Sequence, residues 1–149
     1  MIVDTMPILI GLALAPAIGG AATLLRADRD RALYPVMLIV TASYYVLFAI
    51  IGAEHDIGRQ LMIAAGFVVA AAAGFRRSLW LVVIAFVAHG VLDVVYNDHV
   101  VGNTGVPPWW PSFCLAFDLA AAAFLTWRLA RETAVAPRIA SSPTTSAAS

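Results

Sequence analysis

The sequence predicts an all-α, polytopic integral membrane protein built as a bundle of five transmembrane helices. First, 62% of the 149 residues are hydrophobic and 12% are charged, about half the charged share of a soluble domain. Second, five apolar segments alternate with short polar or charged stretches. Third, the arginines are concentrated in alternate connections, the pattern that orients membrane helices.

The apolar segments are long enough to cross a bilayer, which takes about 20 helical residues. The predicted helices span about 6–25, 32–52, 59–75, 79–96 and 112–129. Together they form one transmembrane domain over residues 1–131. Residues 132–149 are rich in Ala, Ser, Thr and Pro, a composition that predicts a disordered cytoplasmic tail.

The first and third helices each carry small residues at every fourth position, which lets another helix backbone approach closely. The two rows are Gly11/Ala15/Gly19 and Gly66/Ala70/Gly74. They predict tight packing inside the bundle, and either row could also support a homo-oligomer.

The second helix begins with Pro35 in its first turn, where proline is tolerated. Tyr44 and Tyr45 follow near its far end. Because adjacent residues on a helix point in different directions, one tyrosine is expected to face the bundle and the other lipid or the interface.

The fourth helix carries His89, Asp93 and Asn97 at intervals of four, so they share one face. The fifth helix begins after Pro111, which puts Asp118 about six residues, or roughly 9 Å, along it. A linker of about 15 residues allows the two helices to be antiparallel neighbours. Asp93 and Asp118 are therefore expected at similar depth.

Orientation follows from the arginines, which account for all nine basic residues. Eight lie in the connections at 26–31 and 76–77 or at and beyond the C-terminal end of the fifth helix, and only Arg59 falls on the other side. The positive-inside rule then places the N-terminus outside and the C-terminus in the cytoplasm. The N-terminus carries Asp4 and no arginine, unlike a signal peptide. We expect a multi-pass protein of an inner (plasma) membrane.

Polar groups gather on the outer side of this topology and form the candidate ligand or proton pathway: His89, Asp93, Asp118, Tyr44, Tyr45, Asn97, Trp109 and Trp110. Ionisable residues inside a membrane are costly and often mark solute or proton paths. The first hypothesis is an outward-facing site that binds or translocates a small solute, a proton or a lipid headgroup.

A second hypothesis uses His89, Asp93 and Asp118 as ligands of a divalent metal such as zinc, in a membrane-embedded hydrolase. Three N/O ligands and an open water position are enough for a catalytic zinc. The chain has no H-E-x-x-H motif, and no catalytic residue is assigned. A third hypothesis is a structural or partner-binding membrane subunit without a site.

Each candidate also has a purely structural explanation. His89 and Asp93 can be a polar pair that fixes helix register, and Asp118 can be a protonated acid bonded to a backbone carbonyl. The two tryptophans can belong to the aromatic belt of the interface. The single cysteine, Cys114, excludes an intrachain disulfide. A net charge of zero gives no support for nucleic-acid binding, so the expected partner is the lipid bilayer.

Overall fold

The computed structural model describes residues 5–27, 31–53, 57–99 and 105–140, with the backbone alone for 96–99 and 135–140. Within these ranges all regular structure is helical. The five helices are α1 (Thr5–Leu24), α2 (Leu33–Ile51), α3 (Ile57–Arg76), α4 (Leu79–His99) and α5 (Trp110–Ala140). The prediction of an all-α chain with five helices is confirmed.

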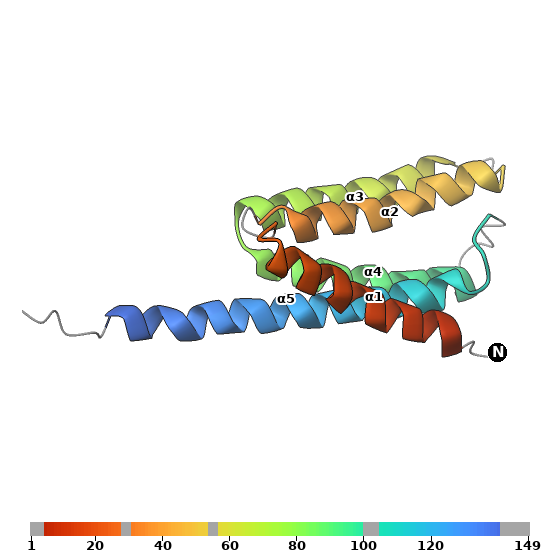
Figure 1. Ribbon diagram of the computed structural model, residues 1–149. Coiled ribbons are helices and arrows are strands. Elements are labelled where there is room, and N and C mark those ends of the chain that lie inside the picture. The colour runs from red at the N-terminus through yellow and green to blue at the C-terminus, as the bar shows by residue number, and fades with distance from the viewer. Residues whose placement is uncertain (1–4, 28–30, 54–56, 100–104, 141–149) are drawn as a thin grey trace, which may run out of the picture.

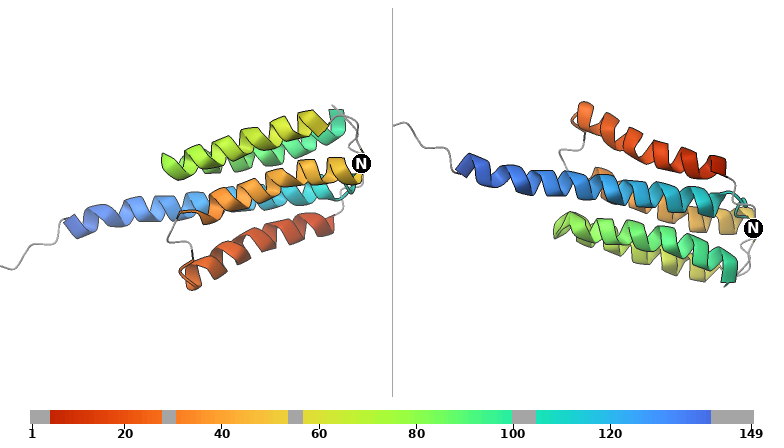
Figure 2. Two further views of the ribbon diagram at one scale, coloured as in Figure 1. Left: turned by 90° about the horizontal axis from the view of Figure 1, so that it is seen from above. Right: turned by 90° about the horizontal axis from the view of Figure 1, so that it is seen from below.

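The helices form two layers (Figure 1). One layer contains α2 and α3, and the other contains α1, α5 and α4 with α5 in the middle (Figure 2). Successive helices run in opposite directions, so the N-terminal end of α1 and the C-terminal end of α5 lie at opposite ends of the bundle.

Four helices are long and apolar enough to cross a membrane: α1, α2, α3 and the Trp110–Ala134 part of α5. In α4 the apolar stretch, Leu79–Val95, is shorter. Large apolar side chains are exposed on all five helices, while His89, Asp93 and Asp118 are buried. A soluble protein has the opposite distribution, so this is the surface of a membrane protein.

Small residues allow α1 to pack closely against α5. A Cβ at Gly11 would come within 2.6 Å of the Phe113 carbonyl oxygen and 2.9 Å of the Phe117 amide nitrogen. Gly11, Ala15 and Gly19 are all buried. Among the described helices, the backbone of α1 comes close to that of α5 alone and stays apart from that of α2, its neighbour in sequence.

The second row of small residues is used in part. Gly74 lies against Val82, at the turn between α3 and α4. Gly66 has open space where a Cβ would be and lies on the exposed side of α3. The first row thus packs within the chain, and the second row does so only at Gly74. An oligomer that forms through either row stays a prediction.

The fifth helix extends beyond its predicted end. Sequence patterning ends it near Leu129, whereas α5 continues to Ala140, into the segment predicted to be a disordered tail. Arg128 and Glu132 form an ion pair across one turn, with 3.3 Å between Nη2 and Oε1, and such pairs support an exposed helix. Residues 141–149 of the predicted tail lie outside the described ranges.

Candidate functional site

The candidate site is a polar cluster buried between α2, α4 and α5. His89 and Asp93 come from one face of α4, as their spacing predicts, and Asp118 comes from α5. The exposed fractions of their side chains are 1%, 7% and 0%. Asp118 lies eight residues after Trp110, about 12 Å along the helix. The bundle therefore encloses two carboxyl groups and an imidazole.

Gly90 makes the close approach of α4 to α5 at the cluster possible. A Cβ at this position would lie 3.2 Å from both the Leu115 Cα and the Asp118 Cβ. This is tighter than an ordinary van der Waals contact, and the Leu115 atom belongs to the backbone. Glycine beside His89 thus brings the histidine within hydrogen-bond distance of the opposite helix.

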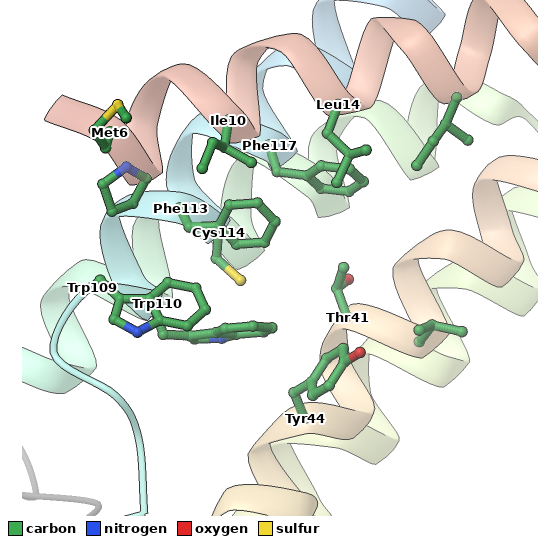
Figure 3. Close-up of a pocket in the computed structure, with 13 residues that line it drawn as sticks. Met6, Ile10, Leu14, Thr41, Tyr44, Trp109, Trp110, Phe113, Cys114 and Phe117 are labelled. Carbon is green, nitrogen blue, oxygen red and sulfur yellow. The ribbon is translucent and has the colours of Figure 1, made fainter.

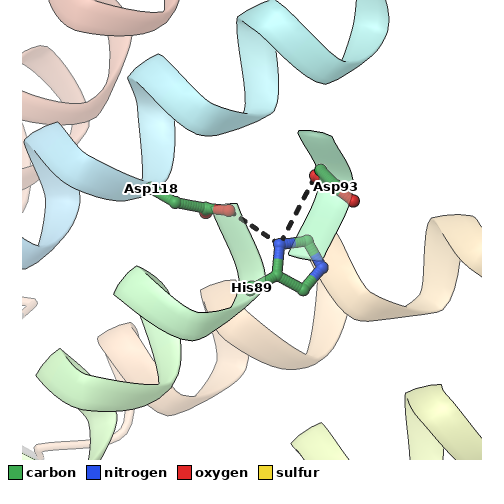
Figure 4. Close-up of side chains that lie close together, drawn as sticks. All are labelled: His89, Asp93 and Asp118. Atoms are coloured by element: carbon green, nitrogen blue, oxygen red, sulfur yellow. Dashed lines mark hydrogen bonds and ion pairs between the residues drawn. The ribbon is translucent and has the colours of Figure 1, made fainter. Parts of the chain in front are cut away.

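Hydrogen bonds connect the cluster across three helices. His89 Nδ1 lies 2.7 Å from Asp118 Oδ2 and 3.7 Å from Asp93 Oδ2 (Figure 4). The Tyr45 hydroxyl donates to Asp93 Oδ1 at 2.5 Å. The first and last contacts have hydrogen-bond length, so one hydrogen bond joins α4 to α5 and another joins α2 to α4.

Aromatic rings and a thiol enclose the histidine. The Phe67 ring of α3 meets the imidazole edge-to-face, with 4.8 Å between ring centroids, and the Tyr45 ring lies 5.4 Å away. The Cys114 thiol of α5 lies beside Asp93. These neighbours bring no positive charge to the cluster. Within the described residues, neither aspartate has an arginine partner.

Three buried atoms of the cluster have no hydrogen-bond partner in the part of the chain that the structure describes: His89 Nε2, Asp93 Oδ2 and Asp118 Oδ1. Buried polar atoms are nearly always bonded, and an exception calls for an explanation such as an ordered water, a bound ion or a functional role. The cluster thus has unused capacity to bind.

One candidate ligand is a metal ion, because the three residues each offer one atom and these atoms lie within 4.8 Å of one another. In a tetrahedral zinc site, each nitrogen or oxygen ligand lies about 2.0–2.1 Å from the metal, so two ligand atoms are roughly 3.3 Å from each other. The 2.7 Å between His89 Nδ1 and Asp118 Oδ2 is shorter and matches a hydrogen bond. The residue types fit a metal, but the spacing in this arrangement fits a shared proton better.

The remaining predicted aromatic residues lie in a different place. Tyr44, Trp109 and Trp110 line an apolar cavity of about 590 Å³ between α1, α2 and α5 (Figure 3). Tyr44 packs on Trp110, with 4.8 Å between ring centroids. Cys114 lines the same cavity, whereas His89, Asp93 and Asp118 do not. Adjacent tyrosines therefore serve different regions, Tyr45 the cluster and Tyr44 the cavity.

Some residues of the site were not among the sequence candidates. Gly90 and Phe67 have no polar atom in their side chains and contribute through shape, so motif reasoning passes over them. The glycine could have been found as the one residue without a side chain next to an intramembrane histidine. The Asn97 side chain, a predicted part of the pathway, lies outside the described residues.

Comparison with family models, with curated proteins and with solved structures gave no match to this chain.

Proposed function

We propose that the chain is a small inner-membrane protein whose five helices all cross the bilayer, with the N-terminus outside and the C-terminus in the cytoplasm, and that its His89–Asp93–Asp118 cluster binds a proton. The arrangement of the helices supports this topology. The C-terminal ends of α1 and α3 and the C-terminal half of α5 lie at one end of the bundle, the predicted cytoplasmic end. Five described arginines belong to these parts of the chain: Arg26, Arg31, Arg76, Arg77 and Arg128.

The observation that carries the proposal is the 2.7 Å contact between His89 Nδ1 and Asp118 Oδ2, two side chains that are at most 1% exposed. A nitrogen and an oxygen at this distance form a hydrogen bond, with one proton between the two atoms. No other charged group among the described residues pairs with them except Asp93.

Charge counting gives the same answer. Two ionised carboxylates beside a neutral imidazole would place two uncompensated negative charges inside the bundle. Isolated charges cost several kcal/mol in such an environment. One added proton on the imidazole halves the charge, and a second on a carboxyl group removes it. The cluster is therefore built to hold protons, in the way that buried acids and histidines do in membrane proton relays.

A proton suits this site better than the other ligands in the first hypothesis. A solute or a lipid headgroup needs a cavity, whereas the cluster side chains contact one another directly and are almost completely buried. A proton needs only a lone pair and a hydrogen-bonded route. Asp93 is the most exposed of the three residues at 7% and lies nearest the outer end of α4, so we place proton entry there.

Infrared difference spectroscopy of the reconstituted protein between acidic and neutral buffer tests proton binding. We expect carbonyl bands of protonated carboxyl groups that disappear in Asp93→Asn and in Asp118→Asn. Tyr45→Phe should shift the Asp93 band, because it removes the hydrogen bond to Oδ1. Tyr44→Phe is the matched control and should leave the spectrum unchanged, because the Tyr44 ring packs in the apolar cavity.

Liposomes carrying a pH-sensitive dye then separate binding from translocation. A proton flux that is lost in Asp118→Asn would show that the cluster is part of a proton path across the membrane. Infrared bands of protonated carboxyl groups without any proton flux would show that the cluster only binds protons. If the Asp93→Asn and Asp118→Asn spectra match the parent spectrum while the variants are less stable, the cluster is a structural pair and the proposal fails.

A metal site remains the second candidate, supported by the convergence of the three ligand atoms. Metal binding would require the His89–Asp118 hydrogen bond to open. Zinc titration of the purified protein, followed by elemental analysis, tests it. Stoichiometric zinc that is lost in His89→Ala would favour the metal over the proton, and zinc well below one per chain that is unchanged in His89→Ala would exclude it.

A further inference from the structure

A second polar region lies at the opposite end of the bundle from the Trp109–Trp110 segment. There a cavity of about 490 Å³ opens between the connection that precedes α2, the start of α4 and the middle of α5. Three arginines line it: Arg31, Arg77 and Arg128. They come from three separate parts of the chain, and Figure 1 shows that the α1–α2 and α3–α4 connections meet at this end.

The arginines are held by different neighbours. Arg128 lies over the Tyr34 ring, with 6.0 Å from Cζ to the ring centroid, and is paired with Glu132. Tyr34 itself is 2% exposed. Arg31 and Arg77 have no ion pair with any carboxylate among the described residues. The lining thus has three positive groups and one negative group, Glu132.

Apolar side chains form the rest of the wall. Leu79, Trp80, Leu125 and Leu129 line the cavity beside the arginines. Trp80 is 46% exposed, as expected of a tryptophan at a membrane interface. The cavity therefore combines a cationic part with an apolar part.

We propose that this cavity binds a phosphate group, and that the group belongs to an anionic phospholipid. Guanidinium groups bind phosphate through paired charge-assisted hydrogen bonds. Basic pockets between transmembrane helices on the cytoplasmic side suit anionic headgroups. The adjoining leucines and tryptophan suit the first carbons of the lipid tails, which a free phosphate ion lacks. The site rests on the proposed topology but is separate from the proton cluster, so proton binding can fail without affecting it.

Native mass spectrometry of the full chain, with phosphatidylglycerol or phosphatidylcholine added in detergent, tests the proposal. We expect one tightly bound phosphatidylglycerol per chain and weaker binding of phosphatidylcholine. Arg77→Gln and Arg31→Gln should each weaken phosphatidylglycerol binding about fivefold, the effect of one arginine near an anionic lipid. Excess inorganic phosphate should not displace the lipid. If it does, the phosphate group alone is recognised and a free ion is the source.

Arg76→Gln is the matched control. It removes the same charge one position earlier, from an exposed residue that does not line the cavity, and should leave binding unchanged. Equal losses in Arg76→Gln and Arg77→Gln, or equal binding of the two lipids, would overturn the proposal, because either result means that no specific site exists. Unchanged melting temperatures verify that the variants are folded.

Discussion

The polar cluster and the apolar cavity lie on either side of Cys114 and differ in how their helices pack. At the cluster, Gly90 brings α4 against α5, and Tyr45 of α2 closes the third side. At the cavity, the backbone of α1 lies close to α5 alone and stands apart from that of α2. One region is sealed and hydrogen-bonded, and the other is open and lined by rings and aliphatic chains.

The difference shows where the bundle needs a fixed geometry. In a bilayer, apolar side chains gain little by leaving lipid for the protein interior, because lipid tails are as apolar as leucine. A gap between α1 and α2 that lipid can fill therefore costs little. Buried carboxyl groups have no such alternative and require partners within hydrogen-bond distance. The following predictions test this contrast.

The largest effect is expected from His89→Leu. This change leaves Asp93 without its neighbouring imidazole and Asp118 without its 2.7 Å partner. Removing one member of a buried pair costs about 3 kcal/mol, to be measured as the free energy of unfolding in mixed micelles. The double variant His89→Leu/Asp118→Leu should recover most of the loss, because it removes both partners. No recovery would show that the cluster is not a coupled pair.

The next largest effect is expected from Gly90→Val, which pushes α4 away from α5. The new side chain would meet the Leu115 backbone and Asp118, and overpacking of this kind costs about 1–3 kcal/mol. The loss should be accompanied by a changed infrared band of Asp118. Gly66→Val is the matched control, since nothing lies within 4 Å of a Cβ there. Equal destabilisation by the two variants would show that Gly90 is not needed for the close packing of α4 against α5.

The smallest effect is expected in the apolar cavity. Leu14→Ala removes a side chain that is 40% exposed and already borders open space. The free energy of unfolding should change by no more than about 0.5 kcal/mol. A loss as large as that of Gly90→Val would show that the cavity walls are packed as tightly as the cluster.

Much of the fold could be predicted because each helix is marked by its own apolar run. The placement of His89 and Asp93 on one face follows from helical periodicity. Asp118 was predicted to lie level with Asp93, whereas it lies opposite Gly90 and bonds to His89, because the antiparallel helices pack in a different register. The end of α5 was predicted too early, because hydropathy marks where a helix leaves the membrane and not where it ends. Arg128 and Glu132 support it beyond that point.

Contacts between helices could not be derived from the sequence. Gly11 marks a face for close packing but does not name its partner, which is the last helix and not the next one. Likewise, periodicity requires Tyr44 and Tyr45 to diverge but does not say which one reaches Asp93. Both answers depend on how the layers are placed, a property of the whole chain.

The dependence of α1 on α5 has a consequence for biogenesis. Of the five described helices, α1 is synthesised before the others, and the helix it packs closely against, α5, is synthesised after them. Until α5 emerges, the Gly11/Ala15/Gly19 row is in contact with lipid or with other membrane proteins. Helices α2, α3 and α4 already contact one another before then. A chain that stops before Trp110 would thus leave α1 without its close packing partner and available to membrane quality control.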